Sequence, residues 1–320
     1  IRKRRKMDYK KFIIGIWVTL LIVGVAGVSA SAPDTISRHS YSNQELAVVE
    51  TGWQQVNSNG FGDLQAGEVS ALETFNGHLY AGTHNPINDA RIFRSPDGVN
   101  WTAVIPPGFG SDHDTAPRAI LDMVVFNGNL YASTGRGNAG QIWRTTTGSF
   151  WSQVVNAGFG DPDTVDFTAM TVYDLGYDQA IYVGATNQVN GAQIWRSFTG
   201  DSNDWAQVAP AVAGTAVSSI TGFAVYDGAL YAAVTFESDT PAQIWQSFGG
   251  AWSTIVDDGF GDSNTIMTGG MAVFGNFLYV GAGNSSDGAQ LWRTNNGTNW
   301  TQVITPGFGD ANNQAVEMVY

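Results

Sequence analysis

A tryptophan returns along this sequence about every fifty residues, and this period constrains the fold more than any other feature. The spacings lie between 47 and 54 residues, and the positions are Trp53, Trp101, Trp151, Trp205, Trp252 and Trp300. A repeat of this length is typical of β-propellers, in which each repeat forms one blade and buries its apolar faces against its neighbours. The chain is therefore expected to form a ring of similar blades.

Each repeat contains four short apolar runs that read as strands. In the repeat around Trp151 they are Met123 to Phe126, Leu130-Tyr131, Gly140 to Arg144 and Trp151 to Val154, and Asn-Gly separates the first two. Asn-Gly between apolar runs is a strong hairpin signal. We predict an all-β fold, a β-propeller of four-stranded antiparallel blades. Residues 51–320 supply five complete blades plus a split or truncated sixth, so this propeller is expected to be truncated at its C-terminus.

The N-terminal region reads as an export segment. Seven of the first eleven residues are basic, Phe12 to Val28 are almost wholly apolar, and Val28-Ser29-Ala30 supplies small residues of the kind a signal peptidase accepts. Residues 1–30 are predicted to be a signal peptide or an uncleaved signal anchor, and residues 31–50 a linker. We expect a secreted or cell-surface protein that touches a membrane only through an uncleaved anchor.

The charge of the exported part narrows the range of partners. Without residues 1–30, eight Arg face 28 − 1 = 27 acidic residues, so the net charge is 8 − 27 = −19. Such a field repels phosphate backbones and excludes nucleic acid, whereas a glycan or an extracellular protein remains compatible with it. The sequence has no Cys, which excludes disulfides and thiolate sites. We expect a monomer.

One hairpin resembles a known motif. Ser95-Pro96-Asp97-Gly98-Val99-Asn100-Trp101 is one residue shorter than the Asp box of sialidase-like propellers. The resemblance implies a structural hairpin and a propeller fold, and it implies nothing about catalysis. A sialidase would also carry an arginine triad, a Tyr/Glu nucleophile pair and an acidic proton donor. The arginines of the third strand recur at one position in successive repeats, which marks them as part of the repeat: Arg94, Arg144, Arg196 and Arg293.

Strand alternation places the long, polar loops of every blade at one end of the propeller. These loops join the fourth strand to the next first strand, and the second strand to the third. Binding residues are expected on such loops around the central channel. The predicted ligand-binding residues are His84, Asp89, Arg91, Asp112, His113, Asp114, Arg118 and Arg136.

The loop after the fourth strand repeats Gly-Phe-Gly, followed in four copies by Asp. A carboxylate beside exposed carbonyls could hold Ca²⁺, and two loops carry paired carboxylates, so Asp112, Asp114, Asp161 and Asp163 are the predicted metal ligands. Capping of the loop's own turn explains the same recurrence. No other cofactor is expected.

Near-identical blades favour a protein without an active site, because catalysis needs unlike residues from different blades. The main prediction is a non-enzymatic exported or cell-surface propeller that binds a glycan or protein through its long-loop face. The alternative is a sialidase-like or other glycoside-cleaving enzyme with catalytic residues partly in a missing blade. A pair of Asp or Glu residues facing each other across the channel would be its signature.

Overall fold

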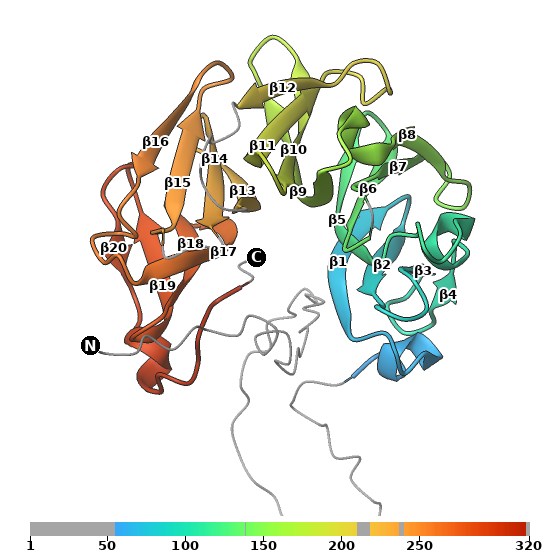
Figure 1. Ribbon diagram of the computed structural model, residues 1–320, viewed down its shortest axis with the longest axis horizontal. Coiled ribbons are helices and arrows are strands. Elements are labelled where there is room, and N and C mark those ends of the chain that lie inside the picture. Colours follow the sequence, from blue (N-terminus) through green and yellow to red (C-terminus); the bar gives the residue numbers. More distant parts are fainter. Residues whose placement is uncertain (1–54, 138, 210–217, 237–239, 318–320) are drawn as a thin grey trace, which may run out of the picture.

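The computed structural model describes residues 55–137, 139–209, 218–236 and 240–317, and it confirms the predicted propeller. Five four-stranded antiparallel units surround a common centre, and one bridge between His84 and Ala119 joins the first two units into a single sheet (Figure 1). The predicted signal segment, the linker and Trp53 lie outside the described residues. Within the described ranges, no helix has the length and apolar character needed to cross a membrane.

The blades follow one another along the chain, and each contributes four consecutive strands. Blade 1 comprises β1 (Glu68–Phe75), β2 (His78–His84), β3 (Ile92–Ser95) and β4 (Thr102–Ala103); blade 2 comprises β5 (Ala119–Phe126), β6 (Asn129–Gly135), β7 (Ile142–Thr145) and β8 (Ser152–Val155). Blade 3 comprises β9 (Thr164–Asp174), β10 (Gln179–Asn187), β11 (Gly191–Ser197) and β12 (Ala206–Ala209); blade 4 comprises β13 (Ser218–Tyr226), β14 (Ala229–Phe236), β15 (Gln243–Ser247) and β16 (Trp252–Val256); blade 5 comprises β17 (Thr265–Phe274), β18 (Phe277–Asn284), β19 (Gly288–Thr294) and β20 (Thr301–Gln302). The first strand of each blade lies innermost, so β1, β5, β9, β13 and β17 surround the centre of the ring, which we call the channel (Figure 1).

The turns between the first and second strands take the predicted form. Asn76 and Gly77 have φ values of 48° and 73°, and Asn127 and Gly128 have 48° and 71°. Positive φ at both central residues defines the type I′ turn, whose twist matches that of the flanking strands. This geometry explains why the sequence places Asn-Gly at these positions.

The hydrophobic core lies between successive blades. Tyr80 and Ile92 of blade 1 pack in one buried cluster with Ile120 and Leu130 of blade 2, and the other clusters follow the same plan. The approach is close at the inner strands. A Cβ added to Gly184 would lie 2.4 Å from the Cβ of Ile220 in blade 4, so only glycine fits there.

The Gly-Phe-Gly loops join each blade to the next one through aromatic stacking. In η3 (Pro107–Gly110), Gly108 and Phe109 both have positive φ, which turns the phenyl ring onto blade 2. Phe109 stacks on Trp143 with ring centroids 4.1 Å apart and meets the edge of Trp151 at 6.0 Å. Equivalent phenylalanines stack in the same way in three further loops: Phe61, Phe159 and Phe260. The recurring Trp and Phe are thus partners in one blade-to-blade contact.

The C-terminal segment lies along the inner edge of blade 5. Ala315 forms an antiparallel bridge with Gly283, and the backbone N–H of Gly270 donates to the Glu317 carbonyl at 2.7 Å. This pairing brings Glu317 to the channel beside β17. The preceding loop, η5 (Pro306–Gly309), carries Phe308, which is 64% exposed and has no ring partner within the described residues.

Candidate functional site

Two acidic side chains occupy the same level of the channel wall on different blades. Glu68 opens β1 and pairs with His84 of β2. Asp166 of β9 pairs with Thr186 of β10. Each of these partners lies four residues after the buried tyrosine of its own strand, so the two carboxyl groups stand at equivalent positions of blades 1 and 3. Both are partly buried.

Arg136 of blade 2 connects these two carboxyl groups. Its guanidinium Nη1 donates to Glu68 Oε1 at 2.6 Å and lies 2.7 Å from His84 Nδ1, which is itself 3.2 Å from the same Glu68 oxygen. The backbone N–H of Arg136 donates to Asp166 Oδ1 at 2.6 Å. Glu68, His84, Arg136 and Asp166 therefore form one group contributed by three blades, which we call the channel cluster.

The environment of the cluster moves the pKa values of its carboxyl groups in opposite directions. Burial favours the protonated form of Glu68, but the hydrogen bond from His84 and the charge of Arg136 outweigh it, so the pKa of Glu68 is lowered. Burial raises the pKa of Asp166, and the hydrogen bond and charge of Arg136 offset this only in part. Two neighbouring carboxyl groups with opposite shifts suit an acid and a base.

A third carboxyl group belongs to Asp122 of β5, which pairs with Ser133 of β6, three residues before Arg136. Its Oδ2 accepts the Met170 N–H at 2.6 Å and its Oδ1 accepts the Met123 N–H at 2.7 Å, so it links blade 2 to blade 3. Burial raises the pKa of Asp122 to about 7, these two hydrogen bonds oppose the rise, and the charge of Glu73 adds to it. Asp122 is the most strongly perturbed carboxyl group of the channel wall.

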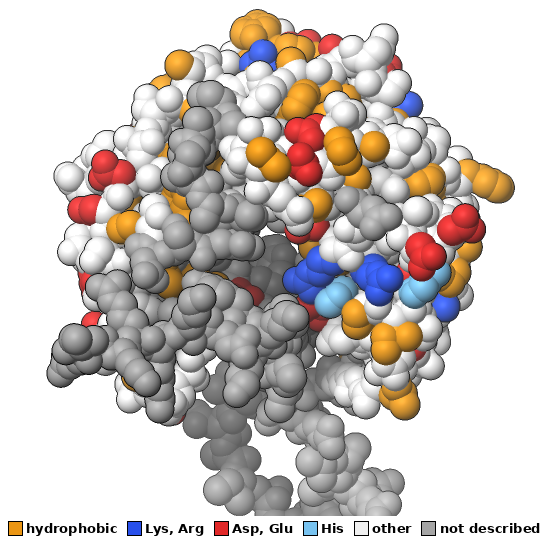
Figure 2. Space-filling model, viewed as in Figure 1, with side chains coloured by type: hydrophobic (Ala, Val, Ile, Leu, Met, Phe, Trp, Pro, Cys, Tyr) orange, Lys and Arg blue, Asp and Glu red, His pale blue; other side chains and the backbone are white. Residues whose placement is uncertain are grey.

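Glu317 faces the cluster from the C-terminal segment. Burial raises the pKa of Glu317, the charge of Glu68 raises it further, and Arg136 lowers it. Glu68 and Arg136 are therefore within electrostatic range of this carboxyl group. Figure 2 shows arginine and histidine side chains gathered with acidic ones near the centre of the molecule, on the side of blades 1 and 2.

The structure brings only some of the predicted ligand-binding residues together. His84 and Arg136 meet in the channel cluster. A second pair lies apart from it, where His113 Nδ1 is 2.8 Å from Asp89 Oδ1. Arg118 donates to the Pro86 carbonyl. These two contacts tie the long loops of blade 1 to each other, which is a structural role.

The remaining predicted residues lie away from the cluster. Arg91 precedes β3, its backbone pairs with Thr83, and its side-chain charge lowers the pKa of Asp63 in the neighbouring loop, where hydrogen bonds have the larger effect. Asp112 and Asp114 are exposed on the loop that precedes β5.

The predicted calcium ligands show the geometry of turn capping. Asp161 Oδ1 accepts the Asp163 N–H at 3.0 Å, and its Oδ2 accepts the side-chain amide of Asn187 at 2.8 Å. The carboxylates of the other copies make the same bond to the N–H two residues ahead: Asp63, Asp262 and Asp310. Calcium binding at Asp161 and Asp163, or at Asp112 and Asp114, stays a prediction.

Sequence reasoning missed Glu68, Asp122 and Asp166. A usable signal was present, because all three break the repeat. The blades that follow the common pattern have Ala71, Ala169 or Gly222 at the register position of Asp122. An ionisable group that replaces a small residue on a channel-facing strand marks a position outside the packing pattern.

Similarity to known proteins is found among solved structures. No protein-family model matches the chain, and no curated protein matches it. Similar solved structures include an exo-1,5-α-L-arabinanase from a bovine ruminal metagenomic library, with 14% identity over 75% of this chain and 98% of that one and a TM-score of 0.42. A thermostable family-43 glycoside hydrolase has 13% identity over 75% and 95%, with a TM-score of 0.42. A lectin from Aleuria aurantia has 14% identity over 75% and 78%, with a TM-score of 0.47.

These findings correct the main functional prediction. The sequence favoured a non-enzymatic propeller, whereas the similar structures include proteins named as glycoside-cleaving enzymes, so the comparison agrees with the alternative rather than with the main prediction. The regularity of the blades does not decide between the two. Regular blades reflect a repeated core, whereas the channel-facing positions are free of that packing pattern and carry unlike residues. At these identities and TM-scores the likeness carries no argument about activity, which has to be argued from the channel cluster.

Proposed function

We propose that the protein is a glycoside-cleaving enzyme whose acid and base are Asp166 and Glu68. The observation that carries the proposal is the channel cluster, in which Arg136 contacts both carboxyl groups while their pKa values shift in opposite directions. Most glycoside hydrolases use one carboxylic acid and one carboxylate on either side of the scissile bond. Residues from separate blades supply these two groups here.

Each member of the cluster has a distinct role in this mechanism. Asp166, whose pKa is raised, is the member of the cluster suited to carry the proton that passes to the leaving glycosidic oxygen. Glu68, held ionised by Arg136 and His84, either activates a water or attacks the anomeric carbon. Arg136 fixes the positions of both carboxyl groups, because its backbone N–H holds Asp166 and its guanidinium holds Glu68.

The charge and the predicted address agree with this activity. A net charge of −19 without residues 1–30 favours a neutral glycan over an anionic polymer. The N-terminal segment is consistent with a secreted or cell-surface location, where such polymers are met. The hairpin from Ser95 to Trp101, which resembles the Asp box of sialidase-like propellers, is a structural turn. In it Asp97 Oδ1 accepts a hydrogen bond from the Asn100 N–H at 2.8 Å.

The test measures reducing ends released from neutral polysaccharides, namely arabinan, xylan, galactan and xyloglucan. We expect the wild-type protein to cleave at least one, and Glu68→Gln and Asp166→Asn each to lower kcat/KM by about a hundredfold or more. Asp227→Asn serves as the matched control and should keep full activity, because Asp227 is exposed on the turn between β13 and β14, where blades 1 and 2 already carry Asn. Equal activity of the cluster variants and the wild type, or no cleavage of any polymer, would overturn the proposal.

A further inference from the structure

The hairpin between β11 and β12 departs from the repeat. Five positions separate Gly200 from Trp205, whereas three separate the corresponding Gly and Trp of blades 1, 2 and 5. The longer hairpin contains Ser202 and Asn203, which are exposed at the outer edge of blade 3. A lengthened hairpin in an otherwise uniform repeat points to a local role other than packing.

This longer hairpin is held firmly in place. Asp204 Oδ2 accepts hydrogen bonds from Ser197 Oγ, from the Phe198 N–H and from the Thr199 N–H, each at 2.8 Å. Asp201 pairs with Arg144 of blade 2 at 2.7 Å. Both carboxylates of the hairpin are therefore engaged in shaping it and in docking it onto the neighbouring blade.

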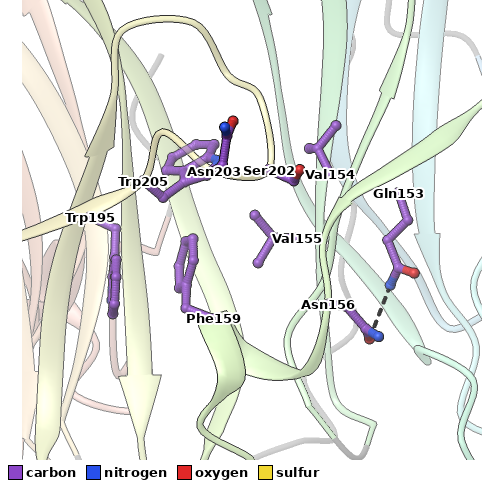
Figure 3. A pocket seen from close by; sticks show the side chains of 9 residues that line it. All are labelled: Gln153, Val154, Val155, Asn156, Phe159, Trp195, Ser202, Asn203 and Trp205. Atoms are coloured by element: carbon purple, nitrogen blue, oxygen red, sulfur yellow. Dashed lines mark hydrogen bonds between the residues drawn. The ribbon is translucent and has the colours of Figure 1, made fainter.

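A pocket of about 360 Å³ lies between this hairpin and blade 2 (Figure 3). Its aromatic side is formed by Phe159, Trp195 and Trp205, with the first two rings stacked 4.1 Å apart. Exposed polar side chains also line it, and these are Gln153, Asn156, Ser202 and Asn203. The volume falls within the range of small-ligand pockets.

The chemistry of these walls selects a class of ligand. Among the residues that the structure describes, no charged side chain lines the pocket, and the carboxylates of the hairpin are already paired, so these residues offer a charged ligand no counter-ion. A purely apolar ligand would leave the amides and the hydroxyl of the rim without partners, which is costly once they are desolvated. A sugar offers an apolar C–H surface for aromatic rings together with hydroxyl groups that both donate and accept hydrogen bonds.

We propose that this pocket binds a neutral saccharide of one or two rings, outside the channel. The site goes beyond the proposed function, because no member of the channel cluster lines it. Gln153 and Asn156 lie 3.4 Å apart at their amide groups, and both supply donors and acceptors at the rim. A polymer held here gains a second attachment point on the same molecule, which raises its effective concentration at the channel.

The test measures binding of neutral di- and trisaccharides of arabinose, xylose, galactose and glucose by calorimetry. The protein used carries Glu68→Gln, so cleavage does not consume the ligand. We expect binding of at least one saccharide, and a tenfold or larger rise in Kd for Gln153→Ala/Asn203→Ala. Asn190→Ala, an exposed amide on the β10–β11 turn, is the matched control and should bind as the parent does. Deleting Ser202 and Asn203 restores the repeat spacing and should abolish binding while the unfolding temperature stays close to the parent value.

The outcomes separate this site from the channel. Binding that survives both pocket variants but is lost on Asp166→Asn places the saccharide in the channel and overturns the pocket. If none of the saccharides binds at millimolar concentration, the proposal of a saccharide pocket is also overturned. Loss of cleavage in the Glu68→Gln and Asp166→Asn variants reports on the channel cluster, whereas binding of short saccharides by the uncleaving Glu68→Gln protein reports on the pocket, so the two proposals fail independently.

Discussion

The ionisation of Asp122 should make the stability of this protein fall as the pH rises. Its pKa is raised from the ordinary 3.8 to about 7 by burial, so the folded state holds this proton at pH values where the unfolded chain has released it. The stabilising contribution of the Asp122 proton to the folded state is fully present below about pH 4 and is lost as the pH rises through about 7. A shift of about three units corresponds to about 4 kcal/mol, which is an upper bound because the side chain keeps partial contact with solvent.

The assay compares urea unfolding of the wild type and of Asp122→Ala between pH 4 and pH 9. Alanine is the residue that blades 1 and 3 carry at this register position, so the variant keeps the repeat pattern. We expect the stability difference between the two proteins to shift by up to about 4 kcal/mol in favour of the variant across this range, and to level off above pH 8. Titrating groups that do not interact with Asp122 cancel in the difference, whereas Glu73, whose charge acts on Asp122, contributes to it. A difference that does not change with pH would refute the reasoning.

Three further predictions follow from the structure. Phe109→Ala should cost about 3 kcal/mol or more in unfolding free energy, because the ring is stacked between blades, whereas Phe308→Ala should cost less than about 1 kcal/mol. Gly135→Ala should abolish cleavage without unfolding the protein, because the new Cβ would lie 2.2 Å from Asp166 Oδ1 and displace it. Calorimetric titration with calcium tests the predicted ligands: heat that is lost in Asp161→Ala/Asp163→Ala would establish a calcium site, whereas no heat, or equal heat from parent and variant, would leave turn capping as the role of Asp161.

The long-loop face illustrates what sequence reasoning reached and where it stopped. Strand alternation correctly grouped the loops at one end, and it selected His84 and Arg136 as candidates. It did not select Glu68 and Asp166, because an isolated acidic residue on a strand has no motif around it. These two lie about a hundred residues apart in the chain, and only the arrangement of blades 1, 2 and 3 brings them to one arginine.

The sequence by itself determined the blades. Strand alternation, Asn-Gly turns and the spacing of Trp and Gly-Phe-Gly are local patterns, and each is fixed by backbone geometry or by a contact to the adjacent blade. Only the tertiary structure decided which side chains meet in the channel cluster and that the longer hairpin of blade 3 encloses a pocket against blade 2. Those contacts depend on the placement of whole blades around a common centre, and no periodicity along the chain encodes which channel-facing residues come to face one another.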